Sequence, residues 1–225
     1  MVLSRGFDAR WFALKALAHA AALMPLMQLV RGALIDIRGL DPLAAVASVL
    51  PTAGLGADPV AAITHATGDW ALRLLLACLA MTPLRRLSGA SWPIRFRRLL
   101  GLYAFFYACL HLSTYLVLDL GGYWTQLFAD IAKRPYITVG FTAWLLLLPL
   151  AITSTRGWMR RLGRRWGQLH RAVYVAAILG VLHFLWLVKS DLREPLIYAA
   201  VAAALLGARL WWRWHPPPSR VQRGA

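Results

Sequence analysis

Six long apolar blocks constrain the fold of this chain more than any other feature of its sequence. A helix needs about 20 mostly apolar residues to cross the hydrocarbon core of a bilayer. Because lipid offers the backbone no hydrogen-bond partners, apolar runs of this length form helices. The sequence therefore predicts an all-α integral membrane protein, a six-transmembrane helical bundle. Its helices are predicted at residues 11–30, 59–84, 99–118, 136–153, 170–188 and 195–212.

The composition agrees with a membrane protein: 60% of the residues are hydrophobic and only 15% are charged. The first block is longer than the apolar core of a signal peptide and no small-residue cleavage site follows it, so we interpret it as the first helix. The run 43–51 is too short to span and is expected to be interfacial or re-entrant. The Pro-rich, charged tail 215–225 is predicted to be disordered, which leaves residues 1–214 as one transmembrane domain.

The net charge of +16 is concentrated at alternate ends of the predicted helices. The loops after the second and fourth blocks hold many arginines and no acid, whereas the acids from Asp36 to Glu194 lie at the opposite ends. A basic excess in short loops marks the cytoplasmic side. We therefore expect a multi-pass protein with both termini in the cytoplasm, and lipid headgroups rather than nucleic acid beside the basic loops.

Two histidines are predicted to lie at the same depth on parallel helices. His111 follows Arg98 by thirteen residues in the third block, and His183 follows His170 by thirteen in the fifth. Thirteen residues of helix rise about 20 Å. Titratable rings are costly in lipid and mark function, and two facing imidazoles are what six-coordinate haem iron requires. The pair therefore predicts a haem held between His111 and His183.

Small residues accompany both histidines at matching offsets. Ala104 and Ala108 precede His111 by seven and three positions, and Ala176 and Gly180 precede His183 by the same steps. These offsets share a helix face with the histidine. The missing volume suits a flat macrocycle, but small residues spaced by four also let transmembrane helices pack closely, and the two histidines would then hydrogen-bond across an interface.

Two further polar residues leave alternatives open. His170 lies at the basic end of the fifth block, where it binds a second haem with an unusual partner, contacts a flavin, or lines the membrane interface. Arg73 lies well inside the second block, one turn from Asp69. It either pairs with Asp69 and reaches outward or neutralises a haem propionate.

Several stretches resemble the MsrQ family, also called YedZ, within the ferric-reductase-like transmembrane group. This family provides the haem-containing membrane subunit of a bacterial methionine sulfoxide reductase system. The similar stretches run in order between residues 54 and 189: "GLGADPVAAITHATGDWAL", "MTPLRR", "RRLLGLYAFFYACLHLSTY", "KRPYITVG", "TSTRGWMRRLGRRWGQLHRAVY" and "HFLWLVK".

The resemblance implies cofactors and the residues that bind them. It implies haem b on His111 and His183, with His170 also important as a ligand, and an FMN whose phosphate binds Arg85 and Arg86. Guanidinium forks suit a phosphate, although membrane topology and lipid headgroups explain such an arginine pair equally well. No catalytic residue is implied in this chain.

An electron-transfer role follows from redox centres stacked across a membrane. We expect electrons from the quinone pool, or from a cytosolic flavin reductase, to pass through FMN and haem b. By resemblance, the acceptor is the periplasmic molybdenum-containing reductase MsrP, which repairs oxidised methionines in envelope proteins. The alternatives are a stand-alone transmembrane ferric or cupric reductase, and a non-redox membrane protein whose histidines only form hydrogen bonds.

Overall fold

The computed structural model describes residues 9–39 and 54–215, and the regular structure there is helical. Contacts divide the chain into two units, residues 1–66 and 67–225. The first unit contains α1 (Ala9–Arg38) and the beginning of α2 (Pro59–Ser88). The predicted short run 43–51 and the tail after His215 lie outside the described residues.

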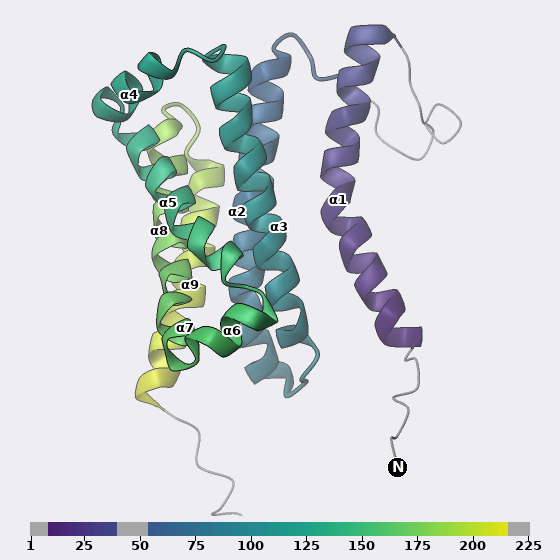
Figure 1. Cartoon of the computed structure of the whole chain (residues 1–225), viewed down its shortest axis with the longest axis vertical. Helices are drawn as coiled ribbons and strands as arrows, with labels where there is room; N and C mark the ends of the chain where they lie inside the picture. Colours follow the sequence, from purple (N-terminus) through teal and green to yellow (C-terminus); the bar gives the residue numbers. More distant parts are fainter. Residues whose placement is uncertain (1–8, 40–53, 216–225) are drawn as a thin grey trace, which may run out of the picture. The chain divides into compact units, whose positions relative to one another are not determined.

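The second unit consists of the rest of α2 and the helices that follow it, shown in Figure 1. Every predicted apolar block coincides with a long helix, so the prediction of six long helices is confirmed. The elements after α2 are α3 (Pro93–Thr114), the π-helical turn η2 (Tyr115–Asp119), α4 (Trp124–Lys133), α5 (Pro135–Ile152), α6 (Arg156–Leu162), α7 (Arg164–Leu169), α8 (Ala172–Leu187) and α9 (Arg193–Trp214).

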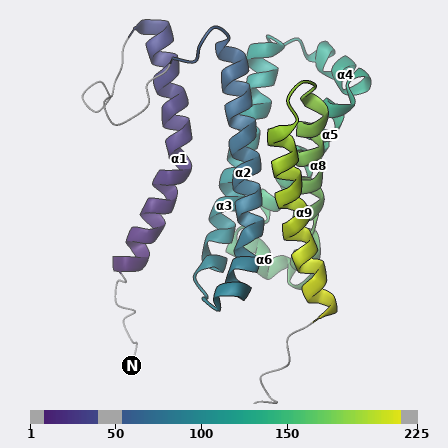
Figure 2. The same ribbon diagram turned by 180° about the vertical axis from the view of Figure 1, so that it is seen from behind.

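The long helices of the second unit form a bundle in which α5 and α8 pack most extensively on each other. Helix α8 also packs on α9, and α3 packs on α5. Figures 1 and 2 show α4 at one end of this unit and α6 at the other. The ends of α2 and α9 lie at the same end as α6, which we call the arginine-rich end because it carries Arg85, Arg86, Arg97 and the arginines of α6 and α7.

Proline and glycine set several helix boundaries in the second unit. Pro93 and Pro135 stand in the first turns of α3 and α5, where a missing N–H costs nothing. Gly163 separates α6 from α7 with a φ of 49°, a left-handed conformation that glycine adopts readily. The Thr155 hydroxyl caps α6 by accepting a hydrogen bond from the Trp158 N–H at 3.3 Å.

Five stretches of helix in the described residues are long and apolar enough to cross a membrane: Ala9–Ile37, Pro93–Asp119, Pro135–Ile152, Arg164–Leu187 and Arg193–Trp214. Helix α2 is equally long, but Asp69 and Arg73 lower the hydropathy of its middle. Several of the helices expose large apolar side chains, such as Ile178 at 50% and Ile197 at 62%, which suits lipid. The sixth span and the cytoplasmic termini stay predictions.

Helix α4 was not predicted from the sequence, and a buried carboxylate holds it in place. Asp130 is 4% exposed. It accepts hydrogen bonds from the Tyr115 hydroxyl at 2.6 Å and from Gln126 at 3.1 Å, and Arg134 lies at 3.4 Å. The hydrogen bond from Tyr115, followed by the charge of Arg134, holds the pKa of Asp130 below its usual range.

Candidate functional site

The side chains of His111 on α3 and His183 on α8 lie side by side. Their ring centroids are 6.0 Å apart and the ring planes meet at 76°. Bonds between a metal ion and an imidazole nitrogen are about 2 Å long. Two rings on opposite sides of one ion therefore have centroids roughly 6 Å apart. The spacing of this pair suits two ligands of a single metal ion.

A backbone carbonyl fixes the orientation and tautomer of His183. The Nδ1 atom of His183 lies 2.7 Å from the carbonyl oxygen of Tyr136, in the first turn of α5. Because a carbonyl oxygen only accepts hydrogen bonds, Nδ1 carries the proton and Nε2 keeps its lone pair. Histidines that ligate metals usually donate their other ring N–H in this way. His183 is therefore oriented as a metal ligand would be.

Each of the two histidines rests against a glycine of a neighbouring helix. A Cβ placed on Gly68 of α2 would lie 3.1 Å from the His111 ring, and one on Gly140 of α5 would lie 2.6 Å from Nδ1 of His183. Heavy atoms in ordinary contact are about 3.5–4.0 Å apart. A larger residue at either glycine would therefore push on an imidazole, so the glycines leave the space in which the rings lie.

The two histidines are too few to bind a bare metal ion, but they suit a metal that is already coordinated within a cofactor. No group of three or more His, Cys, Asp or Glu residues suited to an ion occurs among the residues that the structure describes. A structural zinc site needs four protein ligands. A haem iron takes its equatorial ligands from the porphyrin and needs only axial ones from the protein. The residues present therefore fit a haem.

The small residues next to the histidines serve helix packing in part. Ala104 and Ala176 are fully buried, at 0% exposure. A Cβ on Gly180 would meet Leu72 of α2 at an ordinary 3.5 Å. Helix α2 therefore packs directly on this part of α8, which is the close packing expected of small residues in membrane helices.

His170 forms a separate cluster at the arginine-rich end. Its Nε2 atom lies 3.0 Å from the Thr153 hydroxyl, which donates its own proton to the Pro149 carbonyl at 2.6 Å. Nε2 of His170 is therefore the donor in this contact. The ring stacks on Trp166 at 4.0 Å between centroids, and Trp166 donates to the Thr153 carbonyl at 2.9 Å. With Nε2 engaged, only Nδ1 of His170 is left for a further partner.

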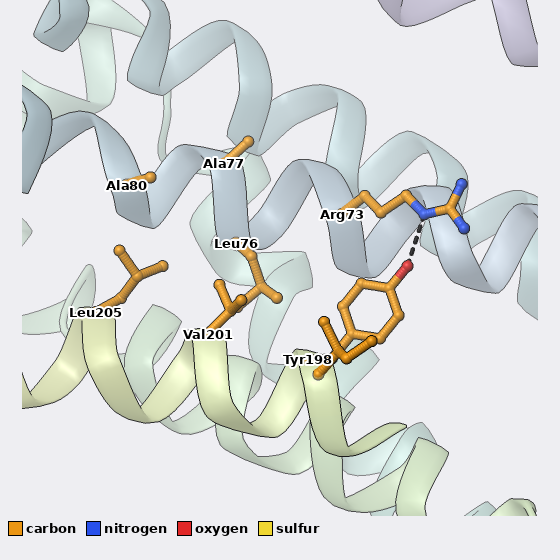
Figure 3. A pocket seen from close by; sticks show the side chains of 8 residues that line it. Arg73, Leu76, Ala77, Ala80, Tyr198, Val201 and Leu205 are labelled. Carbon is orange, nitrogen blue, oxygen red and sulfur yellow. Dashed lines mark hydrogen bonds between the residues drawn. The ribbon is translucent and has the colours of Figure 1, made fainter. Parts of the chain in front are cut away.

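Arg73 contacts its own helix and α9. Its Nε donates a hydrogen bond of 2.6 Å to the Tyr198 hydroxyl, and its guanidinium lies 3.5 Å from Asp69 and 5.2 Å from the Trp70 ring centroid. Figure 3 shows this contact at one end of an apolar groove between α2 and α9, which continues past Val201. These contacts include the Asp69–Arg73 pair, one of the two alternatives for Arg73, and the propionate contact stays a prediction.

Arg85 and Arg86 lie in the last turn of α2 and are exposed. The guanidinium of Arg86 lies 5.2 Å from the ring centroid of Trp212, near the end of α9. Such a contact keeps a cation on an aromatic face while its N–H groups stay accessible. Both arginines are accessible at the arginine-rich end.

The structure reveals three contributors to the histidine site that sequence reasoning missed: Tyr136, Gly68 and Gly140. Both glycines interrupt apolar helices, and an isolated glycine in a helix often has a packing or functional reason. That signal was visible in the stretches "ATGDW" and "YITVG". Nothing in the sequence indicated the role of the Tyr136 carbonyl, because every residue type has a backbone carbonyl.

Comparison with known proteins gives one family and several close relatives. Residues 67–181 match the family described as ferric reductase like transmembrane component. The protein-methionine-sulfoxide reductase heme-binding subunit MsrQ of Xanthomonas campestris pv. campestris (strain 8004) is 69% identical over 159 residues, 71% of this chain and 73% of that protein. The protein of the same name from Herminiimonas arsenicoxydans is 49% identical over 193 residues, 84% and 88% of the two chains.

The matched family segment covers half of the chain and begins at Thr67, where the second structural unit also begins. It contains His111, the His170 cluster and the first part of α8, and the relatives extend the similarity over about two thirds or more of both chains. With several apolar helices long enough to span a bilayer, this is a multi-pass membrane protein, and the chain belongs to the MsrQ family of ferric reductase like transmembrane components.

Proposed function

We propose that this chain is the haem-binding, electron-transferring membrane subunit of a protein-methionine-sulfoxide reductase system. The observation that carries the proposal is the pairing of His111 with His183, whose Nε2 is kept available by the Tyr136 carbonyl. The relatives at up to 69% identity are named as heme-binding subunits of such a reductase. The chain itself would not act on methionine sulfoxide.

Haem b, bound by His111 and His183, supplies a centre that accepts and releases one electron at a time. The protein positions the two imidazole rings that would hold the haem through two glycines and one backbone carbonyl. Preorganised ligands of this kind hold their orientation whether or not the metal is bound. The site is therefore suited to electron transfer without rearrangement.

FMN is the proposed second cofactor, with its phosphate on Arg85 and Arg86. Three features support this position. Both guanidinium groups are accessible at the arginine-rich end, arginine suits phosphate, and the stacked pair Trp166–His170 lies at the same end. In this proposal His170 contacts the flavin or a further redox centre through its unengaged Nδ1.

The proposed electron path begins in a bacterial inner membrane. Quinol, or a cytosolic flavin reductase, delivers electrons at the cytoplasmic, arginine-rich end. The acceptor is a periplasmic reductase of the molybdenum-containing MsrP type, at the end that carries α4. The basic loops that support this orientation follow α2 and α5.

Reconstitution tests the path directly. The purified chain would be placed in liposomes with reduced quinol, and an MsrP-type reductase and a methionine-sulfoxide-containing protein would be added outside. We expect loss of the sulfoxide only when all components are present. Sulfoxide loss that is equally fast without this chain would contradict the proposal.

A stand-alone ferric or cupric reductase is the second candidate, favoured by the description of the matching family. It predicts that the same liposomes reduce external ferric or cupric chelates without any partner protein. The electron-transfer proposal predicts that chelate reduction is slow compared with delivery to the partner reductase.

A further inference from the structure

A proline in α2 leaves one carbonyl near the arginine-rich end without its partner in the helix. Pro83 has no N–H, so the Leu79 carbonyl four residues earlier loses its helical partner. The Nη2 atom of Arg209, 130 residues away on α9, donates a hydrogen bond to this carbonyl. Leu79 is completely buried. Arg209 therefore reaches from α9 into the contact between the two helices.

The rest of the Arg209 guanidinium is left without hydrogen bonds. Its Nε and Nη1 atoms are buried and have no partner, and the same holds for the hydroxyl of Thr82, next to Pro83. These three atoms are the unsatisfied buried side-chain donors and acceptors of the described residues. The guanidinium stacks at 5.2 Å on the ring of Tyr174 from α8, a contact that supplies no hydrogen-bond acceptor. Buried unpaired donors are costly.

A second cation lies nearby, and carboxylates are absent from the surrounding sequence. The charge of Arg97, on α3, acts on both Arg209 and His170. Arg97 is attached to the same region through its carbonyl, which accepts a bond of 3.2 Å from the Cys78 thiol. Segments 71–118, 131–190 and 195–225 contain no Asp or Glu. The chain thus brings two arginines together without a negative side chain between them.

This cluster lies at a different level from the histidine pair. Tyr174 precedes His183 by nine residues on α8, a separation of about 13 Å along the helix axis. A group bound to Arg209 is therefore well displaced from a metal held by His111 and His183.

We propose that Arg209, together with Arg97, binds a phosphate group that enters from the arginine-rich end and is bordered by α2, α8 and α9. Guanidinium groups bind phosphate through charge-assisted N–H donors, and Nε and Nη1 of Arg209 each hold an N–H without a partner. Thr82 supplies a neighbouring hydroxyl. The phosphate belongs either to FMN, in which case these residues share it with Arg85 and Arg86 and the inference rests on the proposed function, or to a membrane lipid.

A purely structural role for Arg209 makes a different prediction. If Arg209 only replaced the missing N–H of Pro83, one donor to the Leu79 carbonyl would be enough. A glutamine amide keeps a donor but lacks the charge and the fork. Arg209→Gln therefore separates the two roles, and Arg213→Gln, one turn later on α9 and exposed, is the matched control.

The test measures binding of FMN and of riboflavin, which has no phosphate, to the haem-loaded full chain in detergent, by quenching of flavin fluorescence. Co-purified anionic phospholipid is quantified in the same samples by mass spectrometry. If the phosphate belongs to FMN, Arg209→Gln should weaken the affinity for FMN at least tenfold and leave the affinity for riboflavin unchanged. A lipid source predicts that the variant loses bound anionic phospholipid while FMN affinity stays. Arg213→Gln should behave as the unmodified chain in both assays.

The outcomes also separate this inference from the proposed function. If the unmodified chain binds no FMN, the flavin part of the proposed function fails and the lipid measurement alone decides the inference. If FMN binds and Arg209→Gln changes neither the preference for FMN over riboflavin nor the lipid content, the phosphate site is refuted while the proposed function stands. Equal weakening of both flavins, with lipid content unchanged, also refutes it, because it indicates a structural role.

Discussion

The two polar levels of the helical bundle are built in different ways. At the histidine level, which we define by His111 and His183, the rings are positioned by a carbonyl and by two glycines. At the arginine level, defined by Arg97, Arg209 and His170, long side chains reach backbone carbonyls of other segments, and two donors of Arg209 have no partner. The first level is positioned by backbone groups, and the second contains guanidinium donors without a hydrogen-bond partner.

The difference shows that backbone groups and long side chains position polar residues in different ways within a membrane bundle. A carbonyl or a glycine Cα belongs to a helix and moves only with it, so rings placed against them are held rigidly. Long arginine side chains adapt to what binds them. We therefore expect substitutions at the histidine level to reduce haem binding more strongly the closer the added atom lies to an imidazole. Substitutions at the arginine level should instead change which ligands bind.

The largest expected effect comes from adding one methyl group at the histidine level. Gly140→Ala places a Cβ 2.6 Å from Nδ1 of His183, whereas Gly68→Ala places one 3.1 Å from His111. Haem per chain, measured in purified protein, should fall severalfold for Gly140→Ala and less for Gly68→Ala. The control is Gly207→Ala on α9, where a Cβ meets nothing within 4 Å. A larger loss of haem in Gly68→Ala than in Gly140→Ala would mean that contact with these glycines does not position the rings.

A smaller effect is expected from Thr153→Val at the arginine level. This change removes the hydroxyl that accepts from His170 and keeps the side-chain shape. Loss of a side-chain hydrogen bond costs about 1 kcal/mol, so the melting temperature should fall by a few degrees and haem per chain should stay. Thr153→Ser, which restores the hydroxyl, should recover the stability. Loss of haem in Thr153→Val would show that the two levels are not independent.

Tyr198→Phe tests whether Arg73 interacts with a haem held by His111 and His183. The hydroxyl of Tyr198 accepts a bond of 2.6 Å from Arg73, and its removal should lower stability by up to about 1 kcal/mol. The haem midpoint potential should not move, because Arg73 is engaged with α9 and Asp69. Tyr123→Phe, at a residue 74% exposed, is the control. A clear potential shift would favour a propionate contact for Arg73 instead.

The smallest effect is a pH dependence at α4. Because the Tyr115 hydroxyl lowers the pKa of Asp130, the ionised carboxylate contributes stability above the ordinary aspartate pKa of about 3.9. That contribution is lost as the pH falls through the lowered value. Asp130→Asn should therefore lower the melting temperature at neutral pH and flatten its fall in acid. An unchanged acid profile would exclude Asp130 as its source.

The sequence was sufficient for the long helices and for the pairing of the two histidines. The apolar blocks are long enough to be recognised as helices. Because a straight helix rises by a fixed distance per residue, the shared separation of thirteen residues placed His111 and His183 at the same depth and predicted that they are neighbours. Helix α4 was missed because its ten residues are amphipathic and lie between two longer apolar blocks. Short helices of this kind depend on tertiary contacts, here those of Asp130.

The arginine level was less accessible from the sequence. A proline inside a helix predicts a free carbonyl four residues earlier, so Leu79 could have been identified. Its partner could not, because Arg209 is 130 residues away and only the packing of α9 on α2 brings it near. The same reason applies to Thr153, which His170 reaches only through the turn of α6 and α7.

The central claim is that His111 and His183 hold one haem between α3 and α8. The most direct test is the visible spectrum of the purified chain, oxidised and dithionite-reduced, with haem quantified per chain for His111→Ala, His183→Ala and the exposed control His215→Ala. We expect a b-type spectrum in the unmodified chain, its loss in both site variants and its retention in the control. A folded, colourless protein that takes up no added haem would exclude haem binding by this pair, as would full haem content in either site variant.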